Sequence, residues 1–274
     1  MITIDGKKLA GEIRSLLREE ISGLGKKPQL AIVKVGDNSV TEKFLEQKKK
    51  FASDIGISAE IYDFPSNIST EQICKEISKI VHAKENTGIV VQLPLPKSVN
   101  TQDVLDMIPS EKDPDMLSEK SFGLFSAKAS EIFPPVVGAI QYIFMAYGVR
   151  LTAKQVVVVG EGRLVGKPVA TWLINEGIAV SVVNEHTSSI KRLILDADII
   201  ISGAGKPNII TSDMVKDGVV AIDCGTSEVN GRLLGDIDPE VSKKASVFAP
   251  VPGGVGPLTV AMLFRNLVEL AKTR

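Results

Sequence analysis

Residues 155–166 read QVVVVGEGRLVG, a run of valines that ends in a glycine-rich turn. The glycines are Gly160, Gly162 and Gly166, and a helix is predicted to begin near the last of them. Glycine at a strand-to-helix junction permits a tight turn and lets backbone N–H groups approach a pyrophosphate at the positive end of the helix dipole. The spacing GxGxxxG is one residue longer than the common dinucleotide fingerprint, so a tight turn without a ligand remains an alternative.

Short apolar runs alternate with amphipathic segments along the rest of the chain. Continuous Val and Ile runs are typical of strands buried on both faces of a parallel sheet, and the amphipathic segments predict helices that cover it. We therefore expect two α/β domains, of which the second is a Rossmann-type, doubly wound parallel sheet. The apolar runs are LAIVKVG (30–36), AEIYDF (59–64), GIVVQLPLP (88–96), QVVVVG (155–160), AVSVVN (179–184), DIIISGAG (198–205), VVAIDCG (219–225) and VFAPVPGG (247–254), and the main helices are predicted at 41–56, 70–84, 142–148 and 257–274.

Prolines are scattered through residues 97–135, where apolar residues recur with no regular spacing. We expect this stretch to form loops and short helices that lead to a hinge. This stretch divides the chain into an N-terminal domain, residues 1–135, and a dinucleotide-binding domain, residues 136–256. The amphipathic helix at 257–274 is expected to pack back on the N-terminal domain.

Composition excludes several classes of protein. The 274 residues include 32 basic and 33 acidic side chains, so a net charge of −1 gives no field that attracts nucleic acid or an anionic membrane. Hydrophobic residues make up 44% and charged residues 24%, as in globular domains rather than disordered chains. Cys74 and Cys224 lie outside any CxxC pair, and His82 and His186 suggest no metal site. With no signal peptide or membrane span, the chain is expected to be cytoplasmic.

The residues after the second strand of the nucleotide-binding unit bear on the choice of cofactor. Asn184 and Glu185 stand where a side chain would meet the adenosine ribose, and an acidic group there accepts from the 2′-hydroxyl and repels a 2′-phosphate. Glu161, inside the glycine turn, favours NAD for the same reason. An ordinary charged surface remains an alternative, and the residues that favour a phosphate instead are Arg163, Lys167 and His186.

The segment 41–56 places Thr41, Phe44 and Lys48 on one face of a predicted helix. A hydroxyl, an aromatic ring and an ammonium in one line can bind a flat polar ligand. Taken alone, the run Lys48–Lys50 is more typical of a solvated basic surface. A different face, which we expect to be buried as the core stripe of the helix, carries Leu45, Ala52 and Ile55.

Three further features suggest a ligand. Gln92 ends an apolar strand, and ligands of open α/β sheets bind beyond the carboxyl ends of strands. Asp113 and Asp115 lie in EKDPDML, where solvated loop acids or helix caps are the ordinary alternatives. Residues 250–259, PVPGGVGPLT, concentrate prolines and glycines before a helix, which is typical of a turn that a ligand approaches closely.

Together these motifs resemble the bifunctional methylenetetrahydrofolate dehydrogenase/methenyltetrahydrofolate cyclohydrolase family. The resemblance extends over nearly the whole chain, and VQLPLP together with PVPGGVGP is its most specific combination. It implies a folate-handling N-terminal domain, a C-terminal Rossmann domain and a cleft between them. The matching segments are VGDNSVTEKFLEQKKK, VQLPLP, IPSEKDPD, VVVVGEGRLVGKP, ADIIISGAGKP, VVAIDCG, GDID and PVPGGVGPLTVAMLFRN.

The resemblance also implies roles for individual residues. Lys48 corresponds to the family's catalytic lysine, Gln92 to the partner that holds it, and Asp115 to the acid that binds the pterin ring. NADP is the implied cofactor, with NAD as the alternative, a tetrahydrofolate derivative is the substrate, and a homodimer is expected. The implied substrate-binding residues are Thr41, Phe44, Gly254, Val255 and Pro257, and the implied cofactor-binding residues are Gly160, Gly162, Arg163, Val165, Gly166, Asn184, Glu185, Thr187, Gly203 and Ala204.

The sequence departs from the family pattern at several positions. Phe44 replaces the tyrosine that stacks on the pterin, which keeps the ring and loses the phenolic hydroxyl. Glu161-Gly162 and Asn184-Glu185 replace the Arg-Ser and His-Ser pairs that commonly serve the 2′-phosphate, which weakens the expectation of NADP. Met116 stands where the family has glycine, and Pro135-Val136-Val137 where it has Cys-Thr-Pro.

The activity implied is oxidation of methylene-tetrahydrofolate to the methenyl form, followed by hydrolysis to formyl-tetrahydrofolate. One alternative is an NAD(P)-linked dehydrogenase for another small substrate, because the fold alone permits it. Others are an NAD-dependent or cyclohydrolase-only enzyme, and a folate- or nucleotide-binding protein that has lost activity, suggested by Phe44 and the altered glycine turn.

Overall fold

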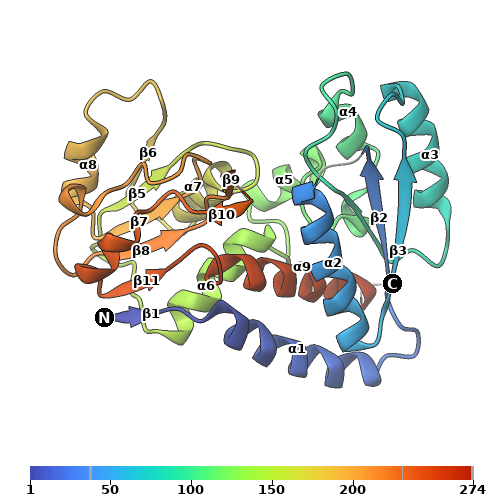
Figure 1. Cartoon of the computed structure of the whole chain (residues 1–274). Helices are drawn as coiled ribbons and strands as arrows, with labels where there is room; N and C mark the ends of the chain where they lie inside the picture. Colours follow the sequence, from blue (N-terminus) through green and yellow to red (C-terminus); the bar gives the residue numbers. More distant parts are fainter. Residues whose placement is uncertain (37–38, 230, 273–274) are drawn as a thin grey trace. The chain divides into compact units, whose positions relative to one another are not determined.

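The computed structural model describes residues 1–36, 39–229 and 231–272, with the backbone alone at residues 39–41 and 43. The chain forms two compact units (Figure 1). We call them the six-stranded unit, Met1–Ala10 with Val136–Thr259, and the three-stranded unit, Gly11–Pro135 with Val260–Arg274. None of the described helices is both long and apolar enough to span a bilayer. Two helices contribute residues to both units, α1 (Gly6–Ser22) and α9 (Val255–Lys272).

The six-stranded unit is a fully parallel sheet in the order β1-β11-β8-β7-β5-β6. The crossover from β6 to β7 passes over β5, as expected of a Rossmann-type sheet, so the prediction of two α/β domains is confirmed. The strands are β1 (Ile2–Thr3), β5 (Val156–Val159), β6 (Val180–Val183), β7 (Ile199–Ser202), β8 (Val220–Asp223) and β11 (Val247–Ala249).

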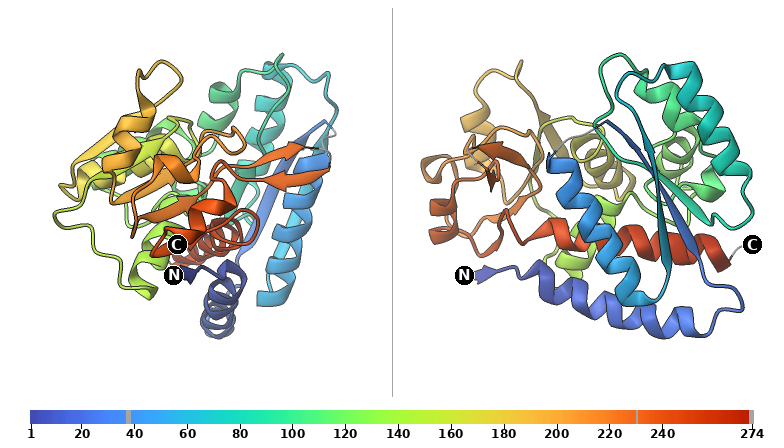
Figure 2. Two further views of the ribbon diagram at one scale, coloured as in Figure 1. Left: turned by 60° about the vertical axis from the view of Figure 1, so that its left-hand side comes forward. Right: turned by 45° about the vertical axis from the view of Figure 1, so that its right-hand side comes forward.

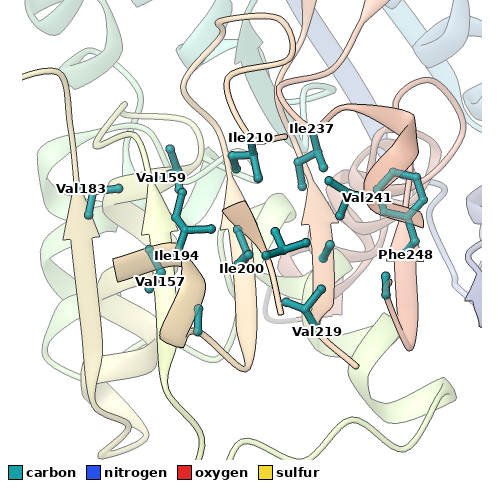
Figure 3. Packing of buried hydrophobic residues seen from close by; sticks show 14 residues of the cluster. Val157, Val159, Val183, Ile194, Ile200, Ile210, Val219, Ile237, Val241 and Phe248 are labelled. Atoms are coloured by element: carbon teal, nitrogen blue, oxygen red, sulfur yellow. The ribbon is translucent and has the colours of Figure 1, made fainter. Parts of the chain in front are cut away.

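Helices and a hairpin complete this unit. Figure 3 shows the apolar cluster on one face of the sheet, where Val157 and Ile200 of the central strands pack with Ile194 of α8. The helices are α6 (Pro135–Ala146), α7 (Gly166–Asn175) and α8 (Ile190–Asp196), with short 3-10 turns η2 (Ser212–Met214) and η3 (Pro239–Lys243). The antiparallel hairpin, which the sequence did not predict, pairs β9 (Ser227–Val229) with β10 (Arg232–Leu234).

Position within the sheet decides how far each strand is buried. Every residue of β5 and β7 is buried, as the valine and isoleucine runs predict. The same expectation is wrong for β6, where Ser181 and Val182 are exposed because this strand lies at the edge of the sheet. At the other edge, Ile2 pairs with Val247, so the first strand of the chain joins a sheet built from its second half.

The three-stranded unit is a smaller parallel sheet in the order β3-β2-β4. Helices α2 and α3 cover opposite faces of it (Figure 2). Its strands are β2 (Gln29–Val35), β3 (Ser58–Phe64) and β4 (Gly88–Val91), and its helices are α2 (Ser39–Ile55), α3 (Thr70–His82), α4 (Thr101–Asp106) and α5 (Glu119–Ser126), with the 3-10 turn η1 (Ser110–Lys112).

The helices of this unit follow their sequence patterns. In α3, Ser69 and Gln72 form a reciprocal capping box, which satisfies two backbone N–H groups at the helix start. The predicted burial of Leu45, Ala52 and Ile55 on α2 is confirmed, because they are at most 2% exposed. The expectation that they lie on a different face from Lys48 is wrong, because Ile55 follows Lys48 by seven residues, which puts both on one face of a helix. On the same side of α2, the ring of Phe51 stacks on that of Phe264 from α9, with centroids 5.1 Å apart.

Candidate active site

In the three-stranded unit, the middle of α2 and the end of β4 bring a lysine and a glutamine together. The Nζ atom of Lys48 donates a hydrogen bond to Oε1 of Gln92 over 2.9 Å. The other end of the Gln92 amide is also fixed, because Nε2 donates to the carbonyl oxygen of Leu93. The backbone N–H of Gln92 donates to Val33, so the strand ladder continues to this residue. Gln92 is therefore buried and held by two hydrogen bonds of its own, and its side-chain oxygen accepts from the lysine.

The environment of Lys48 differs from that of the lysines beside it. Lys49 and Lys50 are exposed, as expected of a solvated basic surface, whereas Lys48 is partly buried. Burial lowers the pKa of Lys48, because the charged form loses solvation, and the negative charge of Asp115 partly opposes this. The lysine can therefore exchange a proton more readily near neutral pH than an exposed lysine can.

Asp115 is the acidic partner of this lysine. Burial raises the pKa of Asp115 to about 6, the charge of Lys48 lowers it, and the neighbouring charge of Asp113 raises it. The side chain is only partly buried, so it is accessible to a ligand. A carboxyl group with this pKa changes its protonation near physiological pH, which suits a proton-transfer or hydrogen-bonding role.

Asp113 has a different role from its neighbour. It is 2% exposed, so the alternative of a solvated loop acid is excluded for this residue. Its carboxylate accepts hydrogen bonds from the backbone N–H and the hydroxyl of Ser118, over 2.9 and 2.8 Å. Ser118 in turn caps helix α5 by accepting from the N–H of Ser121. Asp113 thus anchors the loop that carries Asp115 to the start of a helix.

Asn266, on α9, supports the same loop and was not predicted from the sequence. Its side-chain amide donates two hydrogen bonds of 2.8 Å, to the carbonyl oxygens of Pro114 and Phe133. Asn266 is 7% exposed on an otherwise apolar helix face. An amide on a buried helix face needs partners, which is the sequence signal that could have identified it.

Two residues expected beside Lys48 can be placed only in part. Phe44 is partly buried on α2, one turn before Lys48, which leaves its ring available for stacking. Thr41 belongs to the same helix, but its side chain lies outside the described part of the structure.

In the six-stranded unit, the glycine turn links β5 to α7 with very close backbone packing. Gly160 has a φ of +95°, which favours glycine. A Cβ at Gly166 would lie 2.0 Å from the carbonyl oxygen of Gly160, so only glycine lets the helix start so near the strand. Among the described residues no side chain caps the start of α7, where Val165 is the N-cap residue. The N–H of Lys167 donates to the carbonyl oxygen of Gly162 over 3.0 Å and Pro168 has no N–H, so the positive end of the helix dipole is the feature that suits a pyrophosphate.

Polar residues beyond β6 meet the other side of this turn. The side-chain amide of Asn184 donates to Glu161 over 3.1 Å, and the hydroxyl of Thr187 accepts from the backbone N–H of Asn184. Glu185 pairs with Lys206 at 3.2 Å. The structure thus brings together the predicted cofactor-binding residues Asn184, Glu185 and Thr187. Arg163, predicted with them, is exposed within the turn.

The loop after β7 holds the predicted residues Gly203 and Ala204. The backbone N–H of Ala204 donates to the carboxylate of Asp236 over 2.6 Å, so this N–H is already engaged within the protein. If Ala204 contacts a cofactor, it does so through atoms other than its backbone N–H. Asp236 belongs to the GDID motif, and no role for it was predicted from the sequence.

The proline- and glycine-rich segment that leads into α9 contains the predicted residue Gly254, and the first turn of α9 contains Val255 and Pro257. The N–H of Gly254 donates to the carbonyl oxygen of Pro250 over 2.8 Å, which closes the turn. Val255, the first residue of α9, is 2% exposed. The structure places these residues in the six-stranded unit and Lys48 in the three-stranded unit.

Two family models match the chain. Residues 4–115 match the catalytic domain of tetrahydrofolate dehydrogenase/cyclohydrolase. Residues 134–274 match the NAD(P)-binding domain of the same family. The two matches cover both the glycine turn and the Lys48 region.

Relatives match the chain over its full length. The bifunctional protein FolD of Nautilia profundicola is 38% identical over 99% of this chain and 98% of its own. The structure of the FolD methylenetetrahydrofolate dehydrogenase/cyclohydrolase of Campylobacter jejuni superimposes with a TM-score of 0.96 at 36% identity, over 100% of this chain and 99% of that one. The Trypanosoma brucei FolD, solved with NADP and an inhibitor, has a TM-score of 0.94 at 32% identity, over 100% of this chain and 98% of that one.

Proposed function

The chain belongs to the tetrahydrofolate dehydrogenase/cyclohydrolase family, and we propose that it is a bifunctional enzyme of one-carbon folate metabolism. It oxidises methylene-tetrahydrofolate to the methenyl form with NADP, or alternatively NAD, and then hydrolyses the methenyl form to formyl-tetrahydrofolate. The observation that carries this proposal is the hydrogen bond between Lys48 and Gln92, made next to a carboxyl group with a raised pKa.

The six-stranded unit supplies the dinucleotide site. The start of α7, which no described side chain caps, and the close-packed glycine turn fit a pyrophosphate, and we propose Gly160, Gly162 and Gly166 as residues that the dinucleotide approaches. These residues would hold a dinucleotide that would supply the hydride acceptor for oxidation of the methylene carbon of the folate. The chain contributes positioning to this step, since a transfer between two bound molecules depends on distance and orientation.

The hydrolytic step depends on Lys48. Water forms a C–O bond to the amidinium-like carbon of the methenyl form, and the neutral amine of Lys48 takes the proton that water loses. The hydroxyl group then loses its proton as one C–N bond breaks and the ring nitrogen gains one, so the net reaction releases one proton. A lowered lysine pKa makes the neutral amine available, and the hydrogen bond to Gln92 keeps Nζ in place.

Asp115 and Phe44 are proposed to hold the substrate. The carboxylate of Asp115 accepts hydrogen bonds from the pterin ring, and its charge stabilises the protonated form of Lys48 during proton transfer. Phe44 stacks on the flat ring and has no hydroxyl to contribute to proton transfer. Thr41, Gly254, Val255 and Pro257 remain proposed substrate-binding residues.

Initial rates test the proposal directly. Reduction of NADP and of NAD by methylene-tetrahydrofolate is measured at equal concentrations, beside separate hydrolysis of the methenyl compound. Lys48→Met is expected to lower the hydrolysis rate by roughly 100-fold or more, because general acid–base catalysis contributes about that much. Lys49→Met is the matched control, one residue away and exposed. Hydrolysis at the normal rate by the Lys48 variant would remove Lys48 from the mechanism.

The same assay separates the alternatives. A dehydrogenase for another small substrate would reduce the dinucleotide only with that substrate and would not hydrolyse the methenyl compound. A cyclohydrolase-only enzyme would hydrolyse it without reducing either dinucleotide. A binding protein would show neither rate and would still bind folate in calorimetry. The hydrogen bond between Lys48 and Gln92, together with the charge of Asp115 that acts on Lys48, favours the bifunctional enzyme.

We also propose that the enzyme is a cytoplasmic homodimer that associates through its six-stranded unit. Strand β6 lies at the edge of the sheet, and Val182 on it is 42% exposed. Ile174 on the neighbouring helix α7 is 64% exposed. In the described sheet this strand edge has no partner strand, and its exposed apolar side chains favour association with a second copy.

Light scattering after gel filtration should give the dimer mass, and Val182→Lys should shift it towards the monomer. A wild-type monomer at micromolar concentration would contradict the dimer.

A further inference from the structure

A buried aspartate beneath the glycine turn has no part in either reaction as proposed above. Asp236 is fully buried, at 0% exposed, in the segment between the β9–β10 hairpin and η3. A carboxylate loses much solvation in such a position and persists only where hydrogen-bond donors replace the water. The identity of its donors therefore shows what the carboxylate stabilises.

In the described part of the chain, the hydrogen-bond donors to the Asp236 carboxylate come from the end of β7 and the loop after it. The Oδ2 atom accepts from the hydroxyl of Ser202 over 2.7 Å and from the backbone N–H groups of Ala204 and Gly205 over 2.6 and 3.3 Å. The Oδ1 atom accepts from the backbone N–H of Lys206 over 2.9 Å. One side chain thus accepts from the backbone N–H groups of three successive residues, 204–206, which lie in a loop outside the helices and strands.

This loop lies directly against the glycine turn. A Cβ at Gly160 would lie 2.7 Å from the carbonyl oxygen of Gly203, and a Cβ at Gly203 would lie 2.4 Å from Cγ1 of Val165. At its other end, the loop carries Lys206, whose ammonium pairs with Glu185 beyond β6. A displacement of the loop would therefore move both the turn and the polar residues at the end of β6.

Asp236 is itself held by a second buried aspartate. The carboxylate of Asp223, at the end of β8, accepts from the backbone N–H groups of Asp236 and Ile237 over 3.1 and 2.9 Å. Asp223 is 1% exposed, so this contact also lies inside the unit. The backbone at Asp236 is thus fixed before its side chain reaches the loop.

We propose that Asp236 is a positioning residue of the dinucleotide site, because its buried carboxylate fixes residues 203–206 and, through them, the glycine turn. The proposal rests on the dehydrogenase function proposed above. It predicts that dinucleotide binding depends on Asp236, whereas hydrolysis at Lys48 does not, because Lys48 belongs to the three-stranded unit.

Asp236→Asn in the full-length protein tests this proposal. An amide has one acceptor oxygen, so its NH₂ group would face a backbone N–H on one side, and the loop would have to move. Calorimetry should show Kd values for NAD and NADP raised roughly tenfold, from the loss of about one charge-assisted hydrogen bond. The KM for the dinucleotide should rise with it, while the hydrolysis rate stays within about twofold of wild type, since independent sites do not couple.

Asp238→Asn is the matched control, because it makes the same chemical change two residues away. The side chain of Asp238 caps the start of η3 and does not bond to the loop at residues 203–206 in the described structure. It should leave both Kd values unchanged. Unchanged dinucleotide Kd values in a folded Asp236→Asn protein would overturn the proposal. A parallel fall of both activities and of the melting temperature would also overturn it, because the role would then be structural throughout.

If the Asp236→Asn protein does not fold, a smaller change at a hydrogen-bond donor of Asp236 still tests the proposal. Ser202→Ala removes the hydroxyl donor alone and should raise the dinucleotide Kd about twofold to threefold, with the hydrolysis rate unchanged. An unchanged Kd in Ser202→Ala would overturn the proposal. Failure of the proposed function is distinguishable, because wild-type protein would then neither bind dinucleotide nor hydrolyse the methenyl compound.

Discussion

Each unit contains a pair of aspartates in which one carboxylate holds a loop and the other has a raised pKa. In the three-stranded unit, Asp113 accepts from Ser118, and Asp115 has a pKa of about 6. In the six-stranded unit, Asp236 accepts from the loop after β7, and Asp223 also has a pKa of about 6. Burial is the main cause of both raised pKa values.

The two raised pKa values belong to groups with different access to ligands. Asp223 is 1% exposed, and its oxygen atoms accept from the backbone N–H groups of Gly225, Asp236 and Ile237. Asp115 is partly exposed, and its charge acts on Lys48. A raised pKa therefore does not by itself identify a reactive carboxyl group. Access to a ligand and a partner that exchanges protons distinguish Asp115 from Asp223.

The largest expected effect comes from removing the accessible member of the pairs. Asp115→Asn should lower the hydrolysis rate by roughly 100-fold or more, because the amide carries no charge to stabilise protonated Lys48 and binds the pterin less well. The measurement is the rate of loss of methenyl absorbance at saturating substrate. Asp223→Asn, the matched change in the other unit, should alter this rate less than about threefold. Equal losses in both variants would contradict the distinction between the pairs.

The pH dependence of hydrolysis sharpens the same comparison. Because the neutral amine of Lys48 is the proposed base, the wild-type hydrolysis rate should rise with pH. An inflection near pH 6 should appear on this rise, because Asp115 is proposed to act in its ionised form and its pKa is about 6. This inflection should be absent in Asp115→Asn and present in Asp223→Asn. Its persistence in Asp115→Asn would assign the inflection to another group.

The loop-holding member of the first pair should affect stability. Asp113→Ala leaves the N–H and hydroxyl of Ser118 without their acceptor, which should lower the free energy of unfolding by about 2 kcal/mol. The displaced loop should also slow hydrolysis severalfold. Urea titration measures the stability, with Asp103→Ala as control, because Asp103 is an exposed acid in the first turn of α4. A loss no larger than that of the control would contradict the anchoring role.

The inaccessible member of the second pair should appear in the pH dependence of stability. The pKa of Asp223 is about 6 in the folded chain and near 3.9 when unfolded, so the folded chain binds this proton more tightly. Its stabilising contribution is therefore full below about pH 4 and is lost as the pH rises towards 6. The stability difference between wild type and Asp223→Asn should fall across that window by up to about 1.4 kcal/mol per pH unit.

An exposed acid provides the control of opposite sign. The hydrogen bond from Lys191 is the main cause that lowers the pKa of Asp213 to about 2, so its contribution is present above about pH 4 and is lost as the pH falls. Asp213→Asn should therefore leave the window from pH 4 to 6 nearly unchanged. A wild-type to Asp223→Asn difference that stays constant from pH 4 to 6.5 would show that Asp223 does not titrate there.

The smallest expected effect belongs to an exposed carboxylate, which acts through its charge alone. Glu161→Gln keeps an oxygen that can accept from Asn184 and removes the charge beside the end of β6. Affinity for NADP should rise relative to NAD by about threefold at low salt, since exposed charges are screened. Calorimetry with both dinucleotides measures the ratio, and Glu176→Gln, at the other end of α7, is the control. An unchanged ratio would show that Glu161 does not face the 2′ position.

Elements with a local pattern were predictable. The valine run of β5 and the glycine turn after it were both recognised, because a strand buried on both faces must be apolar and a close helix start must be glycine. The core stripe of α2 followed from helical periodicity. The Lys48 region was identified by its resemblance to a family, because on charge alone a lysine run is typical of solvent-exposed surface.

Contacts between distant segments were not predictable in the same way. Asn266 reaches a carbonyl oxygen 152 residues earlier in the chain, and Asp236 reaches Ala204. The pairing of β1 with β11 joins residues 2–3 to residues 247–248. Such contacts leave no periodicity in the sequence, since each depends on which segments the folded backbone brings together.

The sequence by itself determined the two α/β domains, the glycine turn and the family, because these depend on local periodicity, on backbone conformations that require glycine, and on long ordered motifs. The tertiary structure alone decided that Lys48 is desolvated while Lys49 is not, and that Asp113 is buried while Asp115 is accessible. The physical reason is that the protonation and hydrogen bonding of a polar side chain are set by its surroundings, and segments far away in the chain supply those surroundings.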